Sequence, residues 1–256
     1  MIRVTVLGSG TSTGVPSVAC ECPTCRSTDP RDKRLRTSLL IRSETTTVVI
    51  DTSLDFRQQM LQHDIMDIDG IVFTHHHFDH IGGFDDIRPY NFRYNRPIRI
   101  HAMRETVDVL HDTFPYAFGL IAPSGAAVPS VDTHIIDTDP FTIGDITLQP
   151  VPMKHGSMRV NGYRIGSLAY CTDTNSISRD SMDMLTGLST LILDGLRYEP
   201  HPTHFTVSQA LAVIDELQPG QTYLTHISHQ IKHADCETRL PANVRLAYDG
   251  LEVTIP

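Results

Sequence analysis

Alternating hydrophobic and polar positions predict strands along much of the chain. Residues 2–7 (IRVTVL) alternate with the period of two that a half-buried strand shows. Residues 37–43 and 45–53 are rich in β-branched side chains and meet at Ser43-Glu44, as the two strands of a hairpin do. The apolar run within 69–75 predicts a buried strand. Further strands are expected near 97–102, 134–137, 146–151, 163–172, 190–194, 222–225, 244–247 and 251–255.

Helical spacing of apolar residues marks three segments between these strands. We expect helices at 54–65, 104–114 and 206–217, and Pro115 lies just beyond the second of them. Residues 115–133 are rich in Pro, Gly and Ala without periodicity and are predicted to form a loop. Because strands and helices alternate without a low-complexity linker, we expect one domain over residues 1–256, with a two-sheet core and helices outside.

Composition narrows the classes of partner. The net charge of −9 argues against a general nucleic-acid coat, because phosphate backbones are held mainly by Lys and Arg. It leaves small phosphate substrates open, since bound metal ions can reverse the local sign of a site. Fourteen histidines are more than packing needs, and His is the commonest metal ligand near neutral pH.

The sequence also predicts a cytoplasmic protein. It has no run of roughly 20 apolar residues, the length of a membrane span. The N-terminal MIRVTVLGSG is better explained as a first strand than as a signal peptide. Five cysteines in a reducing compartment are expected to be thiols or metal ligands rather than a disulfide framework.

The segment FTHHHFDHIGG carries the strongest chemical signal. It places His75, His77, Asp79 and His80 directly after a predicted buried strand. Two histidines one residue apart can reach one ion from a turn, and the Asp and His that follow are offset enough to hold a second. An exposed, solvated His-rich turn is the alternative, but it does not explain why an apolar strand leads into these four side chains.

A two-metal site needs more ligands, and three later segments offer them. His155 follows the strand-like run before VPMKHGS, Asp173 lies in LAYCTDTNS, and His226 lies in TYLTHISH. Each alone would be a cap or a core-edge residue. Their common position after a predicted strand favours a shared metal centre.

A second cluster lies in SVACECPTCRS, where Cys20, Cys22 and Cys25 have the spacing of a metal knuckle. A closed zinc site needs four ligands, so the spacing leaves the fourth ligand open. A redox pair or an adventitious metal site would also fit the cysteines alone.

The pattern His75-x-His77-x-Asp79-His80, followed by His155, Asp173 and His226, resembles that of the metallo-β-lactamase superfamily of dinuclear hydrolases. The resemblance implies a four-layer αββα sandwich with the metals at one edge. It implies that His75, His77 and His155 hold the first ion, that Asp79, His80 and His226 hold the second, and that Asp173 bridges them. True lactamases have a Cys in place of Asp173; Cys171, two residues away, is expected to face the other way.

The cysteine cluster narrows this resemblance. Together with GVP, LTHISHQ and DG-x-E, it resembles the PhnP-type cyclic phosphodiesterases, in which three cysteines and a histidine, here His229, hold a structural zinc. The resemblance implies hydrolysis of small cyclic phosphodiesters, with 5-phosphoribosyl 1,2-cyclic phosphate as the family substrate. The catalytic ions stay open between zinc and manganese, because His and carboxylate ligands suit both.

Other residues are assigned by position. His204 and Asp79 are the candidate catalytic residues; the resemblance favours His204 over His201 as general acid or phosphate contact. Asp51 is expected either to orient a metal-bound His or to cap a turn. Three arginines in DIRPYNFRYNRP could contact a second phosphate or only water: Arg88, Arg93 and Arg96.

Two other functions are considered. A ribonuclease Z-like tRNA 3′-processing endonuclease shares the ligand pattern but needs a basic RNA-gripping arm, which this acidic sequence does not indicate. A non-catalytic zinc-stabilised binding protein predicts lost ligands, and none is missing. We therefore expect a small phosphodiester substrate, no membrane and no nucleic-acid partner; a homodimer is a possible state.

Overall fold

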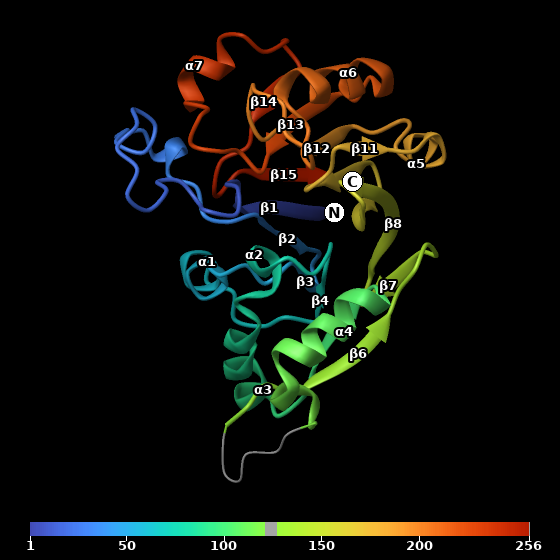
Figure 1. Ribbon diagram of the computed structural model, residues 1–256. Helices are drawn as coiled ribbons and strands as arrows, with labels where there is room; N and C mark the ends of the chain where they lie inside the picture. The colour runs from blue at the N-terminus through green and yellow to red at the C-terminus, as the bar shows by residue number, and fades with distance from the viewer. Residues whose placement is uncertain (121–126, 256) are drawn as a thin grey trace.

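Two mixed β-sheets lie face to face in the computed structural model, which describes residues 1–120 and 127–255 (Figure 1). The first sheet has seven strands in the order β15-β1-β2-β3-β4-β5-β6. They are β1 (Ile2–Gly8), β2 (Ser38–Arg42), β3 (Thr47–Ile50), β4 (Gly70–Val72), β5 (Ile98–Ala102), β6 (Val131–Ile135) and β15 (Glu252–Ile255).

The second sheet has eight strands in the order β11-β8-β9-β10-β12-β13-β14, with β7 paired to β8. Its strands are β7 (Phe141–Ile143), β8 (Ile146–His155), β9 (Met158–Ile165), β10 (Leu168–Cys171), β11 (Ser176–Ile177), β12 (Thr190–Asp194), β13 (Gln221–Thr225) and β14 (Val244–Leu246). Between the sheets, apolar side chains of the first, such as Val6 and Ile41, pack with side chains of the second, such as Leu148, Tyr163 and Ile192.

Helices cover the outer face of each sheet (Figure 1). The first sheet carries α1 (Phe56–Gln62), α2 (Phe78–Ile81), α3 (Arg88–Tyr94) and α4 (Arg104–Thr113), and the second carries α5 (Arg179–Met184), α6 (Val207–Leu217) and α7 (His233–Glu237). Short 3-10 helices lie at Pro30–Asp32, Phe84–Ile87 and Pro115–Phe118. The predicted αββα architecture is therefore confirmed. Among the described residues, no helix is long and apolar enough to cross a membrane.

The strands that carry the chemical motifs end at one edge. β3 and β4 are parallel, and so are β10, β12 and β13. β8 is antiparallel to β9, which is antiparallel to β10, so β8 runs in the same direction as β10. The carboxyl ends of neighbouring parallel strands meet at the same edge of a sheet, which is where ligands bind in many folds of this kind.

Three expectations about elements were wrong. The strand expected at 163–172 is two strands, because Gly166, with a φ of +55°, turns the chain between β9 and β10. Residues 88–94 form helix α3, not a loop; Pro89 suits its first turn, and Asn95 ends it in the left-handed region, with a φ of 47°. The loop expected at 115–133 contains a 3-10 helix and the start of β6, and its residues 121–126 lie outside the described residues.

Candidate metal centres

Two sets of ligand atoms meet at the common edge. The first set comes from His75, His77 and His155, and the second from Asp79, His80, Asp173 and His226. Within each set, all ligand atoms lie within 4.8 Å of one another. These seven residues are those expected from the sequence, and the structure brings them together from four separate segments.

Asp173 lies between the two sets. Its Oδ1 is 3.3 Å from His80 Nε2, and its Oδ2 is 3.3 Å from His226 Nε2 and 3.9 Å from His75 Nε2. A single carboxylate therefore faces ligand nitrogens of both sets, as a bridging ligand must. Cys171 instead packs on the opposite side of β10, in the core under α6, as the sequence predicted.

The outer nitrogens of two histidines are held by one buried network. Thr74 Oγ1 donates to Asp51 Oδ2 at 2.8 Å, so its lone pair can accept from His75 Nδ1 at 3.0 Å. His80 Nδ1 is 2.8 Å from the same Asp51 oxygen. This arrangement places the proton of each ring on Nδ1 and leaves Nε2 free, so Asp51 has the orienting geometry rather than that of a turn cap.

The inner nitrogens have the character of ligand atoms. His75 Nε2, His80 Nε2 and His226 Nε2 are buried and make no hydrogen bond with the described part of the chain. His155 Nδ1 donates to the Thr203 carbonyl at 2.7 Å, which leaves its Nε2 free as well. Buried polar atoms are rarely left unpaired, so these nitrogens fit divalent metal ions.

The charges around the site fit cations too. Burial alone would raise the pKa of Asp173, but His226 and His80 hold it well below its usual range. Burial would likewise raise the pKa of Asp79, and His80 lowers it. Burial lowers the pKa of His155 to about 4, so this imidazole is neutral at pH 7 with a lone pair to offer. Ionised carboxylates and neutral imidazoles are the forms that bind metals.

Three residues of the centre adopt a left-handed backbone. Asp51, Asp173 and His226 have φ values of 64°, 52° and 58°. Such conformations are uncommon for residues other than glycine and cost free energy unless the surroundings hold them. Each of the three directly follows a strand, so the strained residue turns its side chain into the edge where the donors gather.

His204 lies beside this centre with a partner that the sequence interpretation missed. Its Nδ1 is 2.6 Å from Asp194 Oδ2, and Asp194 is fully buried at the end of β12. The His204 ring lies 4.5 Å, centroid to centroid, from the rings of His155 and His226. Asp194 ends the apolar run TLILD, so an acid at a buried strand end was the signal that could have found it.

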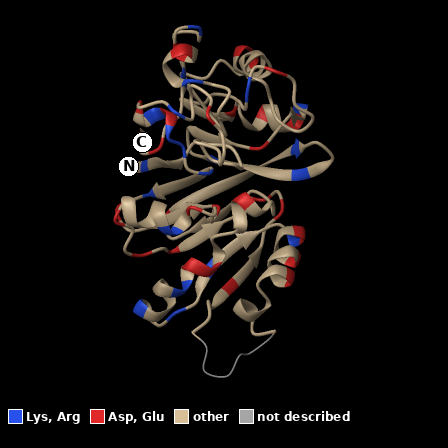
Figure 2. Cartoon of the chain, turned by 60° about the vertical axis from the view of Figure 1, so that its left-hand side comes forward, with Lys and Arg blue, Asp and Glu red and all other residues tan. Residues whose placement is uncertain are grey.

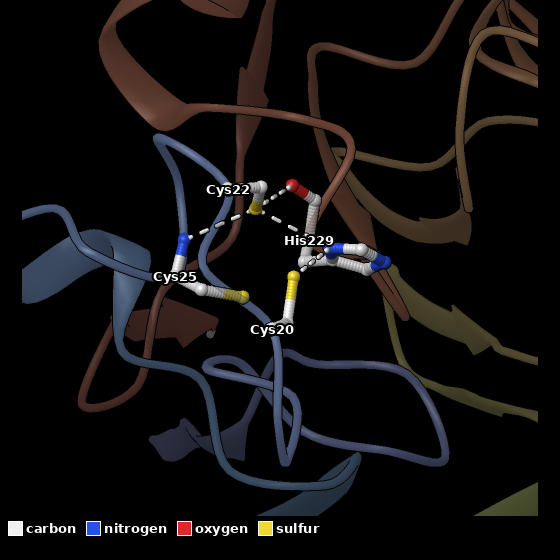
Figure 3. Close-up of side chains that lie close together, drawn as sticks. All are labelled: Cys20, Cys22, Cys25 and His229. Atoms are coloured by element: carbon white, nitrogen blue, oxygen red, sulfur yellow. Dashed lines mark hydrogen bonds between the residues drawn. The ribbon is translucent and has the colours of Figure 1, made fainter.

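The three cysteines and His229 also come together (Figure 3). Cys20 Sγ and Cys22 Sγ lie 3.3 and 3.4 Å from His229 Nδ1. Cys25 Sγ receives a hydrogen bond from the Ser17 N–H at 3.3 Å, and Cys22 Sγ receives one from the Cys25 N–H at 3.4 Å. Backbone N–H groups that point at sulfur stabilise thiolates, so this set fits a structural zinc.

The cysteines differ in how their surroundings treat charge. Burial alone would raise the pKa of Cys22, but hydrogen bonds from the Cys25 N–H and His229 lower it to about 6. Burial raises the pKa of Cys25 to about 11. A bound zinc ion would supply the positive charge that a third and a fourth ligand need in order to lose their protons together.

The arginines considered as phosphate contacts lie elsewhere. Arg96 pairs with Asp67 at 2.7 Å and donates to the Ile68 carbonyl, just before the start of β4. His75 follows the other end of that strand, so Arg96 is at the opposite edge of the sheet. Arg93 donates to the Tyr94 hydroxyl, and Arg88 pairs with Asp85 at 2.7 Å. These contacts argue against a role in phosphate binding.

Comparisons with known proteins give the family. The family model described as "Beta-lactamase superfamily domain" matches residues 46–227, more than half of the chain. A solved structure of a diphosphatase from the PhnP family superposes with a TM-score of 0.92 and 42% identity, covering 98% of this chain and 96% of that one.

Two further relatives are informative in different ways. A protein named octanoyltransferase, from Porphyromonas gingivalis, is 38% identical over 258 residues; the match covers 99% of this chain but 52% of that protein, so the chain spans about half its length. Zinc-bound PqqB from Methylobacterium extorquens is 19% identical, with a TM-score of 0.77 over 99% of this chain and 100% of that one, and shows the same fold. The chain belongs to the metallo-β-lactamase superfamily, within its PhnP family, and is a metal-dependent hydrolase.

Proposed function

We propose that the protein hydrolyses small phosphodiesters at a two-ion centre and carries one structural zinc ion in addition. The observation that supports this most is the pair of adjacent donor sets that share Asp173. The unpartnered inner nitrogens of His75, His80 and His226 add to it, because they fit the donor atoms of such a centre.

In this proposal His75, His77 and His155 hold one ion, Asp79, His80 and His226 hold the other, and Asp173 contacts both. Two bound divalent ions would lower the pKa of a water molecule towards about 7 and offset charge on the phosphoryl oxygens. Asp51 and Thr74 keep His75 and His80 in the tautomer that leaves Nε2 free. Zinc and manganese both suit this donor set.

His204 is the proposed general acid. Asp194 holds its Nδ1, so the proton that His204 can deliver is carried on Nε2. A ring nitrogen of His204 lies within 4.8 Å of ligand atoms of His155 and Asp173, close to where the scissile bond would lie. An alkoxide leaving group needs such a proton, whereas a phosphate or a p-nitrophenolate leaves without one.

The proposed substrates are small phosphodiesters, among them 5-phosphoribosyl 1,2-cyclic phosphate and molecules with a diphosphate linkage. The relative with a TM-score of 0.92 is a diphosphatase of the PhnP family, which supports a bond between phosphates as one target. Segments rich in Lys and Arg are interspersed with acidic ones over both halves of the molecule (Figure 2), which favours small substrates over RNA.

Turnover of two probes by metal-replete protein tests this function. Bis(p-nitrophenyl) phosphate and the ribosyl cyclic phosphate are each assayed while the metal content of the same sample is counted. We expect hydrolysis of the first probe and faster hydrolysis of the second, both lost in Asp173→Ala. Absence of turnover on both probes in protein with a full metal content would contradict the proposal, and cleavage of precursor tRNA instead would favour the ribonuclease.

A further inference from the structure

The loop that carries His204 also presents a second histidine. His201 lies between Pro200 and Pro202, and its side chain is half-buried. Its ring centroid lies 5.0 Å from that of His204. Since the His204 ring is 4.5 Å from His155 and from His226, His201 lies one ring further out from the proposed ions.

Side chains hold this loop in place through its carbonyl groups. Arg197 donates to the carbonyls of Glu199 and Pro200 at 3.1 and 2.7 Å. Asn175 donates to the Pro202 carbonyl at 2.9 Å, and His155 to the Thr203 carbonyl at 2.7 Å. Four carbonyls on either side of His201 are therefore fixed, one of them by a proposed metal ligand. Two prolines restrict the backbone further.

The hydrogen bonds of His201 define its tautomer. The Thr203 backbone N–H points at His201 Nδ1 at 3.3 Å, and the Thr203 hydroxyl lies at the same distance. A backbone N–H can only donate, so Nδ1 carries the lone pair and the ring hydrogen is on Nε2. His201 is thus a preorganised N–H donor on the exposed side of His204.

We propose that His201 binds the leaving phosphate of substrates with a diphosphate linkage and so favours these over simple phosphodiesters. This inference rests on the proposed function. In the hydrolysis, a water oxygen bonds to one phosphorus, and the bond from that phosphorus to the bridging oxygen breaks. The bridging oxygen leaves with the second phosphate, and the protons of water pass to the phosphate products and to solvent. The second phosphate carries the charge that the Nε2–H of His201 meets.

The matched variants His201→Phe and His201→Gln separate the donor from the shape of the ring. Phe keeps the ring and removes the donor, whereas Gln can place an N–H close to the position of Nε2. ADP-ribose is the diphosphate-linked probe, and bis(p-nitrophenyl) phosphate is the simple diester. The measured quantity is the ratio of kcat/KM for ADP-ribose to kcat/KM for the diester.

In His201→Phe we expect this ratio to fall by about 10- to 100-fold, the effect of losing a hydrogen bond to a charged group, mainly through a higher KM. In His201→Gln we expect recovery of at least about half of that loss on a logarithmic scale. An unchanged ratio in His201→Phe overturns the inference, as does a wild-type protein that hydrolyses the diester but not ADP-ribose; both leave the proposed function intact. Failure on both probes overturns the proposed function and, with it, this inference.

Discussion

The two donor clusters differ in what surrounds their ligand atoms. In the knuckle (Cys20, Cys22, Cys25 and His229), four protein donors face one another, and backbone N–H groups point at two of the sulfurs. In the His/Asp centre, seven donors form two sets, and other side chains hold the outer nitrogens of the rings. Four protein ligands close a zinc site, whereas a catalytic centre needs positions for water and substrate. The difference assigns structure to the first cluster and chemistry to the second.

The two clusters nevertheless share one turn. His226 belongs to the centre and His229 to the knuckle, three residues later. Arg34, which is fully buried and paired with Asp32, donates to the carbonyls of Ser228 and Ile231. The knuckle and this ion pair thus attach the N-terminal loop to the turn that orients His226, so loss of the structural ion is expected to reach the centre indirectly.

The largest effect is expected from Asp173→Ala. Because this carboxylate faces both donor sets, its loss should lower kcat/KM for bis(p-nitrophenyl) phosphate by on the order of 10³-fold and reduce the number of ions bound at the centre. Steady-state kinetics and elemental analysis measure the two changes. Asp137→Ala is the matched control, since this carboxylate is 74% exposed and pairs with Arg159 on the surface. A variant at Asp173 with near-normal turnover would show that the centre does not share a ligand.

The next effect is expected from Asp194→Asn. The amide cannot hold the Nδ1 proton of His204 as the carboxylate does, so we predict a loss of about 10- to 100-fold in kcat for the ribosyl cyclic phosphate. The loss should be smaller for bis(p-nitrophenyl) phosphate, whose leaving group needs no proton. The basic limb of the pH profile of kcat should move as well. Equal losses on both substrates, with an unmoved pH profile, would leave Asp194 with a structural role only.

Cys22→Ser tests the other side of the comparison. We predict the loss of one zinc ion per chain and of about 3 kcal/mol of unfolding free energy, or roughly 6–12 °C in Tm. Activity at low temperature should fall only as far as the turn carrying His226 loosens. If activity disappeared while the metal count and Tm stayed normal, the knuckle would belong to the chemistry.

The smallest effect is expected from Cys171→Ala. This thiol is fully buried in the apolar core beneath α6, so its removal should cost about 1 kcal/mol of unfolding free energy and leave the metal count unchanged. Calorimetry and elemental analysis check both values. A lost metal ion would place Cys171 among the ligands, as in true lactamases.

The sequence predicted the residues of the centre well because six of its seven donors lie in short motifs at strand ends. The αββα fold and His229 as the fourth knuckle residue came from the family resemblance, since periodicity alone indicated strands with helices between them. Asp194 was missed because a single acid inside TLILDGL looks like the end of a core strand until His204 is seen beside it. The arginines at 88–96 were misplaced because helix α3, initiated by Pro89, directs them away from the centre.

Stepwise chelation with metal counting tests the central claim, that one cluster is catalytic and the other structural. We predict three ions per chain: two that a mild chelator removes together with activity, and one zinc ion that leaves only when the protein unfolds. Returning the first two should restore turnover without a change in Tm of the knuckle-loaded protein. Activity that survives loss of the first two ions, or that depends on the last one alone, would contradict the assignment.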